Sequence, residues 1–81
     1  MSTADAIHAQ LTDVFRDVFD DDALTVGMST TAADVDGWDS MAHVRLMLSV
    51  ERAFGVKFTA SEIGRLKKVG DLIDLIARKS P

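Results

Sequence analysis

The fold is decided by residues 37–48, which read Gly37-Trp38-Asp39-Ser40-Met41-Ala42-His43-Val44-Arg45-Leu46-Met47-Leu48. A long polar, turn-rich segment ends here, and an apolar pattern with helical spacing begins. The Asp-Ser pair marks a helix start at which Asp39 is the better-placed cap, so Ser40 falls in the first turn with its hydroxyl toward solvent. Free backbone N–H groups and the positive end of the helix dipole make this position suitable for a phosphate ester on the serine.

The helix that starts here, the second of the chain, is expected to run from about Ser40 to Phe54, with Gly55 as its C-terminal stop. Its inward face is expected to include Met41, Val44, Met47, Leu48, Val50 and Phe54. The connection before it, residues 20–38, is unusually long for a compact domain and rich in turn residues. Four apolar side chains should hold this connection against the bundle: Leu24, Val26, Met28 and Val35.

Three further helices are predicted around this segment. The first ends near the acidic run at residues 20–22, and its apolar residues at helical spacing are Ile7, Leu11, Val14, Phe15 and Val18. Residues 59–62 have the spacing of a capping box, which predicts a short third helix through about Leu66. The fourth starts at Val69 and ends in Arg78 and Lys79, whose charges favour a helix C-terminus. The predicted fold is all-α, a single domain over residues 1–81 with three longer helices and a short helix three in a four-helix bundle.

Composition limits the class of protein. Eighty-one residues make one small domain without room for a deep catalytic cleft. The chain contains no cysteine, so it has neither a disulfide framework nor a cysteine-based zinc site, which fits a reducing cytoplasm. The first residues have no basic flank or apolar signal core, and no apolar run is long enough to span a bilayer. We expect a soluble, cytoplasmic protein without membrane insertion.

The net charge of −4 hides an asymmetry between the two halves of the chain. Residues 1–39 carry nine acidic residues and one arginine, for a net charge of −8. Residues 40–81 carry four acidic and eight basic residues, for a net charge of +4. The acidic half disfavours nucleic acid as a partner and suits association with basic proteins. Much of this charge also serves as an ordinary solvated surface.

The chain resembles the acyl carrier protein family in several features. They are the Asp-Ser pair, the spacing of apolar residues in 41–48, and then Glu51, Phe54-Gly55-Val56 and Phe58. The resemblance runs without gaps from residue 37 to about residue 76. It implies that a phosphopantetheinyl transferase, using coenzyme A and a divalent metal ion, attaches a 4′-phosphopantetheine arm to Ser40. The arm's thiol would hold a carboxylic acid as a thioester, and it would be the one thiol on a cysteine-free chain. The resemblance thus implies a carrier with no catalytic residues and no resident metal.

The same resemblance assigns roles to residues near the serine. Asp39 would help to position the transferase and its metal ion, and Met41 and Val44 would form an apolar ridge for partner enzymes. Partner recognition is therefore assigned to Asp39, Met41, Val44 and Arg45. An acyl pocket between helices two and three is assigned to Met47, Leu48 and Ile63. The implied partners are an acyl-loading ligase or transferase and a ketosynthase, condensation or other acyl-transfer enzyme. The carrier is expected to act as a monomer.

Two departures from the fatty-acid-synthesis members bear on the pathway. Arg45 and Arg52 balance Asp39 and Glu51, so helix two is close to neutral where those members are acidic. In having a tryptophan, Trp38, before the Asp-Ser pair, the chain is more similar to stand-alone carriers of polyketide, nonribosomal-peptide or other specialised pathways. Trp38 is itself interpreted as a packing residue that holds the connection to the bundle.

Other functions were weighed against the carrier. An unmodified helical adaptor that docks a partner through helix two remains the alternative, and it predicts that the Ser40 hydroxyl is dispensable. A hydrolytic Asp39-Ser40-His43 arrangement lacks a group that orients the base, an oxyanion hole and a sheltered pocket. His43 is instead interpreted as a surface residue beside the arm, able to contact its phosphate when protonated.

Overall fold

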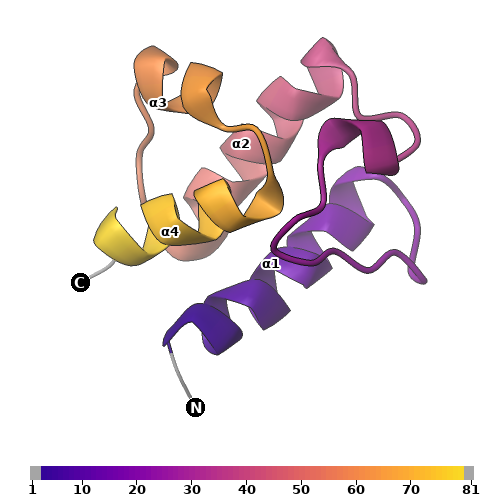
Figure 1. Ribbon diagram of the computed structural model, residues 1–81, viewed down its shortest axis with the longest axis horizontal. Helices are drawn as coiled ribbons and strands as arrows, with labels where there is room; N and C mark the ends of the chain where they lie inside the picture. The colour runs from indigo at the N-terminus through magenta and orange to yellow at the C-terminus, as the bar shows by residue number, and fades with distance from the viewer. Residues whose placement is uncertain (1–2, 80–81) are drawn as a thin grey trace.

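Four α-helices and one 3₁₀ turn form the part of the chain that the computed structural model describes, residues 3–79 (Figure 1). Their bounds are α1 Thr3–Val18, η1 Ala32–Asp34, α2 Ser40–Phe54, α3 Ala60–Arg65 and α4 Val69–Lys79. This arrangement confirms the predicted all-α fold with three longer helices and a short third one. The ends of the expected 1–81 domain, residues 1–2 and 80–81, lie outside the described residues.

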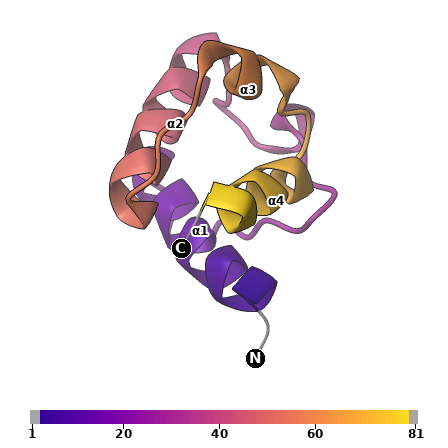
Figure 2. The same ribbon diagram turned by 90° about the vertical axis from the view of Figure 1, so that its left-hand side faces the viewer.

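The core lies between α1, α2 and α4. α1 contacts both α2 and α4, while α3 lies at the end of the molecule away from α1 (Figure 2). Four of the five apolar residues predicted for α1 are buried, and Val18 packs at the edge of the core. The largest fully buried side chains all come from these three helices: Leu11, Phe15, Leu46, Met47, Val50, Val69, Ile73 and Ile76.

The predicted inward face of α2 is only partly correct. Met41, Val44 and Leu48 are 79%, 57% and 50% exposed, whereas the residues of α2 that face the core are Ala42, Leu46, Met47 and Val50. The sequence contains two apolar stripes on different sides of this helix. Residues 42, 46 and 50 form the buried one, on the helix that contacts α1. The inward placement of Met41, Val44 and Leu48 was therefore wrong.

The long connection is held to the bundle at the apolar residues predicted for it. Val26 and Val35 are buried, and Leu24 packs against the core. Met28 is 50% exposed, but its side-chain Cε still lies beside Gly70 of α4. Its backbone carbonyl also accepts a hydrogen bond of 2.8 Å from the amide of Gly70, so Met28 holds the connection to α4 as predicted.

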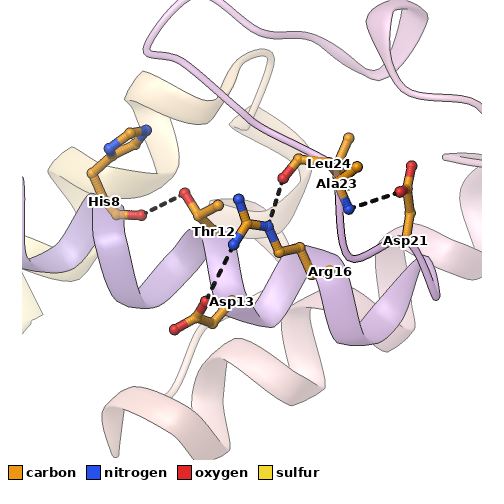
Figure 3. Close-up of polar contacts among 7 residues, drawn as sticks. All are labelled: His8, Thr12, Asp13, Arg16, Asp21, Ala23 and Leu24. Carbon is orange, nitrogen blue, oxygen red and sulfur yellow. Dashed lines mark hydrogen bonds and ion pairs between the residues drawn. The ribbon is translucent and has the colours of Figure 1, made fainter.

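α1 ends at Val18, just before the acidic run, and the chain leaves it through Asp20 at a positive φ of 51°. Figure 3 shows how Arg16 then holds the start of the connection to this helix. Its Nε donates a hydrogen bond of 2.8 Å to the carbonyl of Leu24, and its guanidinium lies 3.9 Å from the carboxylate of Asp13. The connection is thereby ordered from its first residues.

The predicted end of α2 and the predicted start of α3 are confirmed. Gly55 ends α2 in the left-handed conformation, with φ of 67°. Thr59 and Glu62 form the capping box: the carboxylate accepts from the Thr59 amide at 2.8 Å, and the hydroxyl accepts from the Glu62 amide at 3.1 Å. Glu62 also lies 2.9 Å from the ammonium of Lys79, which connects α3 to the end of α4.

Candidate functional site

The start of α2 is built as the sequence predicts. Asp39 has an extended backbone, and its Oδ1 accepts a hydrogen bond of 2.8 Å from the amide of Ala42. Ser40 is the first helical residue and is exposed, so its hydroxyl is not used in capping. Within residues 3–79, the amides of Ser40 and Met41 have no hydrogen-bond acceptor. The helix thus presents two free N–H groups and an unused hydroxyl at one point on its surface.

Trp38 fixes the position of this helix start relative to α1. Its ring meets Phe15 edge-on, with centroids 5.3 Å apart and planes at 77°, and lies 6.1 Å from the ring of Phe19. Edge-to-face contacts of this kind add to the stabilisation from buried area. The packing role predicted for Trp38 is confirmed.

His43 is held by the same tryptophan. The indole Nε1 donates a hydrogen bond of 3.1 Å to Nδ1 of His43, and the two rings are within 22° of parallel. An indole N–H can only donate, so Nδ1 must accept and the neutral ring carries its proton on Nε2. The ring is half-buried and lies at the surface near Ser40. The donor it offers is the Nε2–H of a neutral imidazole.

The three polar side chains of the Asp-Ser-x-x-His segment are not arranged as a catalytic relay. The Asp39 carboxylate is engaged by a backbone amide, and His43 is engaged by Trp38. In the part of the chain that the structure describes, no hydrogen bond joins His43 to Ser40. A proton relay needs a base bonded to the hydroxyl and a third group that orients the base.

Ser40 borders an open hollow of about 480 Å³ between the start of α2 and α3. The apolar part of its lining comes mainly from Trp38 and from α3 and the residue that follows it, Leu66. The polar part comes from Asp39, Ser40, His43 and Lys67. Its lining residues are Ala32, Trp38, Asp39, Ser40, His43, Ile63, Gly64, Leu66 and Lys67. The serine hydroxyl is therefore next to a largely apolar surface that also carries two nitrogen donors and the Asp39 carboxylate.

The three residues predicted for an acyl pocket do not meet in one cavity. Ile63 lines the open hollow, whereas Met47 is buried beside a crevice of only about 10 Å³. Leu48 lies on the outward face of α2, so its assignment to an interior pocket was wrong. Successive residues of a helix point about 100° apart, which separates residue 48 from the inward residue 47.

Partner-recognition residues predicted from the sequence are accessible. Met41, Val44 and Arg45 are exposed on the outward side of α2, and Asp39 is exposed at its cap. Sequence reasoning missed Leu66 and Lys67, which line the hollow. The sequence feature that could have indicated them is their position in the short linker between α3 and α4, residues 66–68. In the structure this linker lies beside the start of α2.

Residues 3–79 contain neither a membrane-spanning helix nor a cluster of metal ligands. None of the helices there has the length and apolar character needed to cross a membrane. No group of three or more His, Cys, Asp or Glu side chains in that range is placed to hold a metal ion.

Comparison with known proteins gives consistent matches. Residues 9–76 match the family model described as "Phosphopantetheine attachment site". The chain is 29% identical over 76 residues to an acyl carrier protein of Rickettsia bellii (strain RML369-C), covering 94% of this chain and 88% of that one. It is 31% identical over 80 residues to acyl carrier protein MbtL of Mycobacterium sp. (strain MCS), covering 99% and 90%. The solution NMR structure of a holo acyl carrier protein from Geobacter metallireducens superposes with a TM-score of 0.83 at 46% identity, covering 98% of this chain and 86% of that one.

Proposed function

This chain belongs to the acyl carrier protein family, and on that premise we propose that Ser40 is the residue to which its 4′-phosphopantetheine arm is attached. One observation carries the proposal: the Ser40 hydroxyl is exposed in the first turn of α2 while Asp39 already provides the cap. A serine that is not needed for capping is free to form a phosphodiester without disturbing the helix start.

The residues around Ser40 fit an attached phosphate. The amides of Ser40 and Met41 are free, and the helix dipole adds partial positive charge at the same point. Lys67, which lines the adjoining hollow, supplies a cation on the other side. When bound, the arm supplies the thiol on which an acyl group is held as a thioester, and the chain has no cysteine of its own for this purpose.

The hollow is suited to hold the arm close to the protein. Trp38, Ile63 and Leu66 offer apolar surface, and the Nε2–H of His43 is a donor for an amide or phosphate oxygen. The crevice beside Met47 is too small for an aliphatic chain unless neighbouring side chains move. We therefore place the arm and a short acyl group in the open hollow; entry of a longer chain toward Met47 and Ile63 remains a prediction.

The family assignment extends to partners as proposals. A phosphopantetheinyl transferase would dock at Asp39 and the start of α2, and acyl-loading and acyl-transfer enzymes would use the same helix. We propose a monomeric carrier with no catalysis of its own, and its cytoplasmic location stays a prediction. The exposed apolar face of α2 also fits the alternative, an unmodified adaptor that binds a partner protein there.

Intact-mass spectrometry tests the attachment site. The purified protein is incubated with coenzyme A, magnesium and a broad-specificity phosphopantetheinyl transferase, beside Ser40→Ala and the control Ser61→Ala, which alters another exposed serine near a helix start. We expect wild type and Ser61→Ala to gain one phosphopantetheine and Ser40→Ala to gain none. If the folded wild type gains nothing while a known carrier is modified in parallel, the adaptor becomes the better hypothesis.

A further inference from the structure

The outward face of α2 carries most of the exposed large apolar surface of the described chain. Of the four large hydrophobic residues exposed in residues 3–79, three lie on this helix. They are Met41, Val44 and Leu48, spaced at i, i+3 and i+7 on one side, and we name them the α2 ridge. Apolar residues grouped in this way mark an interaction surface more often than residues scattered singly.

Two arginines border the α2 ridge. Arg45 follows Met41 by four residues and Arg52 follows Leu48 by four, so each lies one turn along from a ridge residue. Both are exposed, and neither forms an ion pair with any residue in 3–79. Their charges are therefore available to a partner.

The acidic groups of α2 do not balance these arginines on the outward face. The Asp39 carboxylate accepts from the amide of Ala42, and Glu51, which is half-buried, accepts from the amide of Phe58 at 2.8 Å. Both carboxylates are thus turned to backbone amides at the two ends of the helix. A helix that is neutral by composition presents a positive, apolar face to solvent.

Three basic side chains also lie near the serine, where the exposed Asp39 is the neighbouring acidic residue. Lys67 lines the hollow beside Ser40, and Arg65 and Lys68 are exposed on either side of it along the chain. The excess of acidic residues lies before residue 40, in α1 and the long connection. The net charge of −4 therefore misrepresents the surface that a docked enzyme would meet.

We propose that the enzymes that act at Ser40 dock on the α2 ridge through an apolar recess bordered by carboxylates, which pair with Arg45 and Arg52. This rests on the proposed function, since the docked enzymes are those that load the serine or its arm. The carboxylates fix the orientation of the helix in the recess and speed the encounter, while the ridge supplies buried apolar area. Enzymes with a basic recess would be repelled by the same two arginines.

The test uses the phosphopantetheinyl transferase encoded by the same genome. Its kcat/KM for modification is measured at low and high salt for wild type, for Arg45→Glu/Arg52→Glu, and for the control Lys57→Glu/Arg78→Glu. The control makes the same change in net charge at exposed positions away from the ridge. Circular dichroism melts confirm that each variant is folded.

We expect the ridge variant to lose about tenfold in kcat/KM at low salt, mainly through KM, and the loss to shrink as salt screens the charges. The control should stay within about twofold of wild type. A loss below about threefold in the ridge variant, or a gain, overturns the proposal. If the wild-type protein accepts no arm, the proposal that Ser40 is the attachment site is wrong. If all variants are modified at equal rates, only the proposal of a carboxylate-bordered recess is wrong.

Discussion

The hydrogen bond from Trp38 to His43 is the most specific side-chain contact beside Ser40. It fixes the imidazole in one tautomer and holds the ring at the edge of the hollow. In wild type at neutral pH, ¹⁵N shifts of the His43 ring should report a proton on Nε2. Finding the proton on Nδ1 would contradict the contact.

Trp38→Phe keeps an aromatic ring against Phe15 but removes the N–H donor. We expect it to mix the His43 tautomers and to lower the free energy of unfolding by about 0.5–1.5 kcal/mol, the usual net value of one hydrogen bond. His8 is the internal control, because its Nε2 bonds to the carbonyl of Val26 and not to the tryptophan. The His8 ring signals should therefore stay where they are in wild type.

Gly70 is a second residue with a specific requirement. A Cβ at this position would come within 2.7 Å of the Met28 carbonyl oxygen, which accepts the Gly70 amide hydrogen bond. Gly70→Ala should therefore lower the free energy of unfolding by about 1–3 kcal/mol, because the connection must move away from α4. Urea unfolding followed by circular dichroism measures the change.

Gly64→Ala is the matched control for this prediction. Gly64 is also helical, but a Cβ there meets nothing within 4 Å. Its replacement should raise stability by up to about 1 kcal/mol through helix propensity alone. If Gly70→Ala were as stable as Gly64→Ala, the close approach of the connection to α4 would be incorrect.

At the scale of the elements, the ion pair between α3 and α4 links helix stability to pH. The Thr59 backbone N–H, and next the Lys79 ammonium, hold the pKa of the Glu62 carboxyl below its ordinary value of 4.5. A carboxyl whose pKa is lower in the folded state than in the unfolded state contributes stability above the unfolded value. That contribution is lost as the pH falls from about 4.5 through the folded pKa.

Glu62→Gln should therefore be less stable than wild type at pH 7, and the difference should shrink at pH 3. Urea midpoints at the two pH values measure it. Lys79→Met should weaken the pH dependence of stability less than Glu62→Gln does. It leaves in place the larger cause of the lowered Glu62 pKa, the hydrogen bond from the Thr59 amide. A difference between wild type and Glu62→Gln that is the same at both pH values would show that the carboxylate charge does not matter.

At the scale of the whole molecule, three segments distant in the chain combine to form the site. α1 supplies the phenylalanine that holds Trp38, α2 supplies Ser40, and the α3–α4 linker supplies Leu66 and Lys67. α4 is in turn fixed by the long connection, whose Met28 and Thr30 carbonyls accept from its first two amides at 2.8 Å each. The connection is thus part of the scaffold, which explains why a loop of its length is ordered.

The sequence by itself determined the ends of the helices and the position of Ser40. The caps at Asp39, Gly55 and Thr59 each depend on hydrogen bonds or backbone angles within a few residues, so neighbouring letters are sufficient to predict them. The family resemblance over residues 37–76 can also be seen without the tertiary structure, because it depends on the order of residues and not on which helices are in contact.

Only the tertiary structure decided which side of α2 is buried. This helix has one apolar stripe at residues 41, 44 and 48 and another at residues 42, 46 and 50. The second is buried, because α2 packs against α1 and shares a core with α4. The same holds for the Met28 carbonyl on Gly70 and for the indole of Trp38 on His43. These features depend on surfaces that folding brings together. Which face of a helix is buried is set by the elements that pack against it, and the spacing of apolar residues within the helix does not decide it.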